Sequence, residues 1–382
     1  MKKVYLDNAA TTQMRNEVID KMADVMRSNF GNPSSIHGFG RSSKAIIEQS
    51  RKTIAAFFKV SASEIAFTSG GTEADNFILR SCVRDLGVRE IITSRIEHHA
   101  VLHTVEALEA EFGISVKYVA LDGNGMIDYA NLEHLLQSEA KQLVSLMHVN
   151  NEIGNLLDLK RVAQLCQSNK ALFHSDTVQS VGHYNIDLSE IPIDFIVASA
   201  HKFHGPKGVG FAFIRKKSGL KGSLFGGEQE RGFRAGTESI HNIVGLETAL
   251  KMAYANATEE ATYMTKLKTY FITELQTAFP EVIFNGNCAN FSESTYTLIN
   301  VCLPIAAEKS SLLQFQLDLQ GIACSRGSAC QSGSSKASHV LLEILDAEQV
   351  KKPSLRFSMS SFNTEDDINY VIEVLKSFMK VN

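Results

Sequence analysis

A glycine-rich motif around Lys202 offers the clearest nucleophile in the chain. In SAHKFHGPKG an apolar strand ends at Ser199, and His201 and Lys202 then face a glycine-rich turn. A lysine at the mouth of a sheet can be partly desolvated, which lowers its pKa and makes its amine nucleophilic. Such an amine can form a Schiff base with an aldehyde. A solvated surface lysine is the usual alternative, but the small and polar residues around Lys202 would serve no core.

A second motif, TSGGTEADN, has the form of an anion-binding turn. A strand leads into Gly70 and Gly71, and a helix is expected to begin at Thr72. The backbone N–H groups at a helix N-terminus are free, and glycines let a phosphate approach them closely. An ordinary strand–turn–helix junction has the same pattern, so this motif alone leaves both interpretations open.

Two further motifs place polar side chains directly after apolar strands. In FHSDTVQS, Asp176 ends a strand and Gln179 lies beside it. A semi-buried carboxylate normally needs a cationic or N–H partner, although an N-cap of the following turn is the simpler interpretation of Asp176 alone. In MHVNNEIG, polar residues 150–152 follow another strand, and a helix cap would explain only one of the two asparagines.

Together these motifs supply an anion cradle, a carboxylate and a nucleophilic lysine. Pyridoxal 5'-phosphate (PLP) has three matching requirements: its phosphate, its pyridinium nitrogen and its aldehyde. Its ring acts as an electron sink once the ring nitrogen is kept protonated. The combination therefore predicts a PLP site.

The elements that must position these residues alternate along the first two thirds of the chain. Strands are expected over residues 64–69, 90–94, 116–121, 143–149 and 171–176, and helices over 41–58, from 72, 100–112, 131–137 and 159–167. Ser61 and Glu64 could also form a capping box just where the first of these strands begins. Short apolar strands alternating with helices indicate a parallel sheet buried on both faces. Such sheets bind ligands beyond the carboxyl ends of their strands.

The pattern changes after about residue 255. Helices are expected over 259–279, 306–319 and 364–379, and strands over 282–286, 296–303 and 354–359, which suggests a smaller α+β domain. We predict a large domain over residues 12–257 and a small domain formed by residues 1–11 and 258–382. The chain has 382 residues, and a length of this size is consistent with two domains.

Composition excludes several other classes of protein. Hydrophobic residues make up 44% and charged residues 21% of the chain, so wholesale disorder is excluded. The net charge of −4 provides no basic field for nucleic acid or an anionic membrane. No apolar run approaches the ~18 residues that span a bilayer, and no apolar signal-peptide core follows the N-terminal lysines, so we expect a cytoplasmic protein. The six cysteines form no Cys-x2-Cys pair, and Cys330 stands apart in the glycine- and serine-rich stretch CSRGSACQSGSS.

Taken in order, the motifs resemble those of the cysteine desulfurases of the NifS/IscS type, within the class V aminotransferases of PLP fold type I. The resemblance covers nearly the whole length, through YLDNAATT, GNPSSIHGFGR, SGGTEADN, IEHHAV, HVNNEIG, SDTVQS, SAHKFHGPKG, RGFRAGTES, GSACQSGS and LRFSMSSFNTEDDI. It implies a large domain with a mainly parallel seven-stranded sheet covered by helices.

The resemblance implies roles for residues around the PLP ring. Lys202 resembles the lysine that forms the Schiff base with the cofactor, and Asp176 the partner of the pyridine nitrogen. Gln179 resembles the donor to the phenolic oxygen. His98 resembles the histidine that stacks on the ring and can transfer protons, whereas without the resemblance it would be a helix-start histidine.

Other site residues follow from the same resemblance. Thr237 is similar to a phosphate contact that crosses from the second subunit of a homodimer. Asn151, also a cofactor contact, and Arg356 resemble the groups that hold the substrate carboxylate, and the alternative for Arg356 is a solvated arginine at a strand end. The phosphate cradle is implied to consist of Gly71, Thr72, Ser199 and His201.

Cys330 resembles the nucleophile that takes sulfur from L-cysteine. The implied reaction gives L-alanine and a persulfide on Cys330, and sulfur then passes to acceptor proteins, such as an iron–sulfur scaffold, for iron–sulfur cluster assembly or tRNA thiolation. The resemblance implies no resident metal, although Cys330 could be a transient iron–sulfur ligand with a scaffold partner.

Three other functions remain open from the sequence. A related class V enzyme could act on another amino acid, as a selenocysteine lyase or an aminotransferase does. A non-catalytic sulfur-carrier or scaffold protein could retain the fold, but it would not need Lys202, Asp176 and His98 together. A hydrolase built on Cys330 would need a histidine base, and no histidine is convincingly placed for that role.

Overall fold

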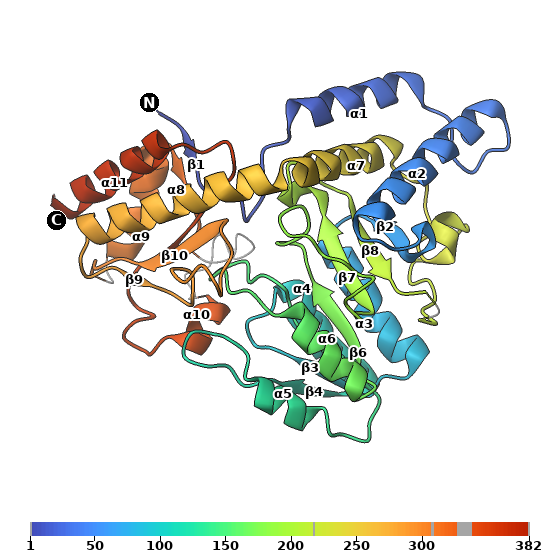
Figure 1. The fold of residues 1–382 in the computed structure, drawn as a ribbon, viewed down its shortest axis with the longest axis horizontal. Helices are drawn as coiled ribbons and strands as arrows, with labels where there is room; N and C mark the ends of the chain where they lie inside the picture. Colours follow the sequence, from blue (N-terminus) through green and yellow to red (C-terminus); the bar gives the residue numbers. More distant parts are fainter. Residues whose placement is uncertain (1, 217, 307–308, 327–337, 381–382) are drawn as a thin grey trace.

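The computed structural model describes residues 2–216, 218–306, 309–326 and 338–380. Its elements form two groups (Figure 1): a large sheet covered by helices, and a smaller group that contains both ends of the chain. The long helix α8 (Ala257–Ala278) runs from one group toward the other.

The large sheet has seven strands in the order β2-β8-β7-β6-β5-β3-β4. Among these strands β8 alone runs opposite to the rest, because it pairs antiparallel with both β7 and β2. The prediction of a mainly parallel seven-stranded sheet is therefore confirmed. The strand bounds are β2 (Ile65–Thr68), β3 (Glu90–Thr93), β4 (Ser115–Tyr118), β5 (Gln142–Ser145), β6 (Leu172–Asp176), β7 (Phe195–Ser199) and β8 (Gly210–Ile214).

Both faces of this sheet are buried, which explains its nearly continuous apolar strands. Along β7, Phe195 and Val197 pack into one core, while Ile196 and Ala198 pack into the core on the other face. The first core is shared with α3 (Gly71–Leu86) and α4 (His99–Phe112). The second is shared with α1 (Asn16–Ser28), α2 (Gly38–Phe57), α5 (Tyr129–Leu135), α6 (Leu159–Ser168) and α7 (Ile240–Ala255).

The segment before β2 satisfies both sequence interpretations. The Glu64 carboxylate accepts a hydrogen bond from Ser61 N at 2.9 Å, and the Ser61 hydroxyl accepts one from Ser63 N, so the capping box is present. It closes the short 3-10 helix η1 (Ala62–Glu64), and β2 begins at the next residue.

The smaller group combines short sheets with helices. Strand β1 (Val4–Tyr5) pairs in parallel with β11 (Ile322–Ala323), and an antiparallel sheet has the order β12-β10-β9. Val4 packs in one core with Phe271 of α8 and Phe357 of β12. The remaining bounds are β9 (Ile283–Phe284), β10 (Leu298–Cys302), β12 (Ser354–Ser358), α9 (Ser310–Leu319), α10 (His339–Ile344) and α11 (Glu365–Lys380).

The predicted division into residues 12–257 and residues 1–11 with 258–382 stays a prediction. At its boundary Asn256 ends α7 and immediately precedes α8, so no linker separates the two helices.

Candidate active site

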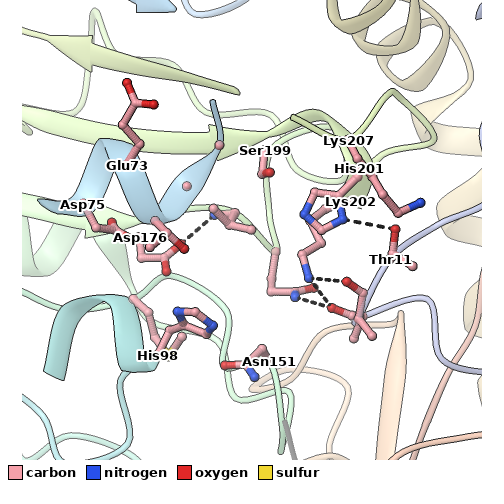
Figure 2. A pocket seen from close by; sticks show the side chains of 18 of the residues that line it. Thr11, Glu73, Asp75, His98, Asn151, Asp176, Ser199, His201, Lys202 and Lys207 are labelled. Carbon is pink, nitrogen blue, oxygen red and sulfur yellow. Dashed lines mark hydrogen bonds between the residues drawn. The ribbon is translucent and has the colours of Figure 1, made fainter. Parts of the chain in front are cut away.

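A cavity of about 460 Å³ opens where the parallel strands of the large sheet end. Its walls come from the ends of β2, β6 and β7, from the loops after β3 and β5, and from residues 9–11 (Figure 2). The sequence-predicted residues that line it are Gly71, Thr72, His98, Asn151, Asp176, Gln179, Ser199, His201, Lys202 and Arg356. Thr237 is exposed and is not part of this lining. Cys330 lies outside the described residues.

Lys202 is held at the edge of the sheet by backbone carbonyls. It ends the 3-10 helix η2 (Ala200–Lys202), which follows β7, and its Nζ donates to Ala9 O at 2.6 Å and to Ala10 O at 2.8 Å. Gln179 Nε2 donates to the same Ala9 O at 2.9 Å. The side chain is half-buried, so the alternative of a solvated surface lysine is wrong. The carbonyls of residues 9 and 10 were not predicted, because a backbone acceptor has no side-chain signature.

Asp176 ends β6 with its carboxyl group buried in the cavity wall. Its Oδ1 accepts from Val178 N at 2.9 Å, so the cap interpretation is correct for one oxygen (Figure 2). Burial raises the pKa of Asp176 to about 6, while the Val178 N–H and Lys202 oppose that rise. A buried carboxylate of this kind is suited to a cationic partner in the cavity.

His98 also has two roles. Its Nδ1 accepts from Ala100 N at 3.1 Å and caps α4, as the helix-start interpretation predicted, while the ring still lines the cavity. Burial, reinforced by Lys202, lowers the pKa of His98 to about 4. The ring is therefore neutral near pH 7, and because Nδ1 accepts, its proton resides on Nε2.

The N-terminus of α3 forms the anion-binding end of the cavity. The intrahelical bonds begin with Ala74 N to Gly70 O, so the amides of residues 71–73 precede the helix ladder. Gly71 is required by packing, because an added Cβ would lie 2.5 Å from Val178 Cγ2. These features favour the anion site over an ordinary junction.

Opposite the N-terminus of α3, the anion-binding end of the cavity carries hydroxyl, imidazole and ammonium groups. Ser199 and His201 line it, and His201 Nδ1 lies 3.1 Å from the hydroxyl of Thr11. Burial and Lys202 lower the pKa of His201 to about 4. Lys207 also lines the cavity and was missed, although it lies within the same glycine-rich motif.

Arg356 reaches the cavity from the smaller group of elements. Its side chain is 1% exposed, so the alternative of a solvated strand-end arginine is wrong. Nη1 donates to Asn151 O at 2.7 Å, and Nη2 donates to Asp7 Oδ1 at 2.8 Å. Its buried Nε has no hydrogen-bond partner among the described residues. Arg356 lines the cavity with one N–H of each Nη held by these two acceptors.

The described cysteines are poor candidates for a thiolate nucleophile. Cys82, Cys166, Cys288 and Cys302 are buried, and Cys324 is half-buried. Burial raises the pKa of Cys324 to about 12, which disfavours its thiolate.

The described residues contain neither a candidate metal site nor a candidate membrane-spanning helix. No group of three or more His, Cys, Asp or Glu side chains in them is arranged to hold a metal ion. None of their helices combines the length and apolarity that a membrane span requires.

Comparisons with known proteins agree with this geometry. Residues 4–371 match the family described as Aminotransferase class-V, whose cysteine desulfurases are PLP-dependent enzymes. A cysteine desulfurase IscS of Clostridium botulinum is 40% identical over 99% of this chain and 95% of its own length. The putative cysteine desulfurase IscS 1 of Bacillus subtilis is 38% identical over 98% and 99% of the two chains. A solved NifS-like protein superposes with a TM-score of 0.91 at 34% identity, covering 100% of both chains. The chain therefore belongs to the class V aminotransferase family, with the PLP fold type I, and within that family to the cysteine desulfurases of the NifS/IscS type.

Proposed function

We propose that this protein is an L-cysteine desulfurase that binds PLP in the cavity at the end of the large sheet. One observation carries the proposal: Lys202, Asp176, His98 and the N-terminus of α3 all line that single cavity. Together they match the aldehyde, the ring nitrogen, the ring face and the phosphate of PLP.

The donor set at the α3 end fits a phosphate. The amides of Gly71 and Thr72, the Ser199 hydroxyl and His201 would hold its oxygens, with Lys207 adding a positive charge. A Cβ at residue 71 would lie 2.5 Å from Val178 Cγ2, so a larger residue there would displace Val178 from the wall of this end.

The other end fits the pyridine ring. Asp176 would accept a hydrogen bond from the protonated ring nitrogen, with its ionised form favoured there by the new cation. Gln179 would donate to the phenolic oxygen, His98 would lie against the ring, and Asn151 would complete the wall. When bound, PLP supplies an aldehyde for amines and a ring that withdraws electrons from the substrate Cα.

Lys202 would hold the cofactor and move protons. Its Nζ already lies among acceptors, 2.6 Å from Ala9 O and 2.8 Å from Ala10 O. The ammonium must lose a proton before Nζ can act as a nucleophile or a base. His98 Nε2–H is a second proton donor at the ring face.

Arg356 would bind the substrate carboxylate through N–H groups that Asp7 and the Asn151 carbonyl do not use. Asn151 would contact the same carboxylate through its amide. The fixed guanidinium would orient L-cysteine with its sulfur toward the incoming thiolate.

Cys330 would then take the sulfur. Its thiolate attacks the substrate sulfur and forms an S–S bond, while the substrate Cβ–S bond breaks and its electron pair stays with the carbon fragment. After protonation at Cβ the products are L-alanine and a Cys330 persulfide, so one thiol and one cysteine give one persulfide and one alanine. The persulfide would pass to acceptor proteins for iron–sulfur cluster assembly or tRNA thiolation, in the reducing cytoplasm.

A homodimer would complete the phosphate site through Thr237. An exposed apolar face supports this: Phe30, Ile36, Phe39 and Phe225 are 74%, 90%, 62% and 85% exposed. The rings of Phe30 and Phe39 lie 5.3 Å apart. Exposed aromatic clusters of this kind mark interfaces. Gln229 Nε2 donates to the Ser34 hydroxyl, which links the region of Phe30 and Phe39 to the segment that leads to Thr237.

The deciding experiment is product analysis with L-cysteine and a thiol reductant, with and without added PLP. The expected products are alanine and sulfide in equal amounts, and Lys202→Ala should form neither while the folded protein still binds PLP weakly. A 2-oxo acid product would instead indicate an aminotransferase. Activity that is confined to L-selenocysteine would indicate a selenocysteine lyase. Normal turnover by Lys202→Ala would refute the assignment.

A further inference from the structure

A buried Ser–His–Asp arrangement lies directly behind the cavity. His174 Nδ1 is 2.9 Å from the hydroxyl of Ser145, its register partner on β5, and its Nε2 is 3.3 Å from Asp75 Oδ1. Ser145 and His174 are 0% exposed and Asp75 is 1% exposed. None of these side chains was singled out by the sequence motifs, since Asp75 lies 99 residues from His174.

This arrangement shares its surroundings with Asp176. Residues 174 and 176 of β6 are two positions apart, so their side chains point to the same face of the strand. Asp75 lies beside Asp176 and lines the same cavity (Figure 2). Any charge on Asp75 therefore acts on the carboxylate that would face the ring nitrogen.

One proton must lie between His174 and Asp75. Neither Nε2 nor Oδ1 has a hydrogen-bond partner among the described residues, although the two atoms lie 3.3 Å apart. If both atoms lacked a hydrogen, two buried lone pairs would face each other at 3.3 Å, which is strongly unfavourable. The proton belongs either to His174, with Asp75 ionised, or to Asp75, with His174 neutral and accepting.

The neighbouring charges decide between these two states. Burial, Asp176 and Glu97 all raise the pKa of Asp75, with no cation among the causes. Asp176 has the Val178 N–H and Lys202 to stabilise its charge, so it is the better site for the negative charge. Burial lowers the pKa of His174 to about 3, which disfavours an imidazolium near pH 7. Glu97 is buried as well, and burial raises its pKa to about 8.

We propose that Asp75 is a neutral carboxylic acid that donates its proton to His174 Nε2, and that this pair keeps the negative charge on Asp176. His174 then carries its hydrogen on Nδ1 and donates it to Ser145 Oγ. Asp75 and His174 are positioning residues, because the effect proposed here reaches the cofactor through the charge on Asp176. The proposal deepens the proposed function and rests on it for the link to PLP.

The proton placement can be tested on the unmodified protein. Nitrogen-15 NMR of histidine-labelled holoenzyme, with His174→Gln used to assign the signal, should show a neutral His174 imidazole bearing hydrogen on Nδ1 between pH 6 and 9. A signal from the Nε2–H tautomer or from an imidazolium would overturn the proposal. This readout does not depend on turnover, and His174→Gln serves only to assign the signal.

Variants test the effect on the cofactor site. Asp75→Asn is a neutral replacement whose amide can still donate to His174, so the pH titration of the bound PLP absorption band should keep its midpoint. If Asp75 were ionised, removing its charge would shift the midpoint by about one pH unit or more, and the proposal would fail.

His174 provides the second comparison. His174→Phe cannot accept the Asp75 proton, and PLP binding should weaken about tenfold. His174→Gln can accept through its amide oxygen and should restore most of that loss. His148→Phe is the matched control, because His148 is also a buried histidine but its ring packs against Tyr184 and not beside Asp75. Equal affinities in the Phe and Gln variants of His174 would contradict the positioning role, whereas failure of the wild type to bind PLP would instead refute the proposed function.

Discussion

Gly71→Ala is the most direct test of the phosphate end of the cavity. The added Cβ would lie 2.5 Å from Val178 Cγ2, whereas carbon atoms pack at about 3.5–4.0 Å, so Val178 must move by about 1 Å. Val178 N also holds Asp176 Oδ1 at 2.9 Å, so the displacement reaches the ring end of the site as well. One extra methyl group in a packed site costs about 1–3 kcal/mol. At about 1.36 kcal/mol per factor of ten, PLP should bind about 5- to 150-fold more weakly.

The assay is titration of PLP into the apoprotein, followed by its visible absorption. Alanine is a better helix former than glycine by about 1 kcal/mol, so thermal stability should not fall by the full packing cost. Gly71→Ala/Val178→Ala removes Cγ2 and leaves the Val178 Cβ position at an ordinary 3.8 Å, so the double variant should regain affinity. Gly123→Ala is the control, because nothing lies within 4 Å of its added Cβ. Wild-type affinity in Gly71→Ala, or a double variant as weak as the single one, would refute the reasoning.

Three further predictions follow from the site and its surroundings. Cys330→Ala should still change its PLP spectrum when L-cysteine is added, but it should lose sulfur transfer. Cys324→Ala should stay active. Mass spectrometry that found the added sulfur on Cys324 would contradict the role of Cys330. Mixing inactive Lys202→Ala subunits with impaired Thr237→Ala subunits should give more activity than either variant alone, because each mixed dimer has one site with both residues intact. A fully active monomer in sedimentation experiments would exclude the shared site. Burial lowers the pKa of Lys268 to about 8, below its unfolded value of about 10.4, so the unfolded chain holds more protons between these pH values. The free energy of unfolding of the wild type, relative to Lys268→Met, should therefore rise by an amount on the order of 3 kcal/mol from pH 8 to 10.4, and a flat difference in denaturant titrations would count against it.

Strand and helix alternation predicted most of the large sheet, because its strands are short apolar runs between amphipathic helices. Two helices that pack on it were not predicted. Helix α7 is buried over most of its length, with Val244, Leu246 and Leu250 among its core residues, so it lacks the one-sided pattern that marks a surface helix. Helix α1 follows Arg15, whose side chain provides no N-cap hydrogen bond. Nothing in the local pattern marked its start.

Site residues were predictable where a polar side chain directly follows an apolar strand, as Asp176 and Lys202 do. They were not predictable where the partner is a backbone carbonyl, as at Ala9, or where two distant elements meet. The contact of Asp75 with His174 is of the second kind, because it depends on how α3 lies across β6.

The ion pair between Asp7 and Arg356 has a consequence for how the protein is made. The two residues are separated by 349 positions, and β1 can pair only after β11 has been synthesised. At about 5–20 residues per second, a ribosome completes Arg356 roughly 17–70 s after Asp7. Until then the segment of residues 9 and 10 is held near Lys202 only from its C-terminal side, where Thr12 N donates to His201 O, while Asp7 on its N-terminal side still lacks Arg356. Nascent chains halted before β12 should therefore contain Lys202, Asp176 and His98 but lack the cavity wall that Arg356 provides, and we expect them to retain PLP less well than the full chain.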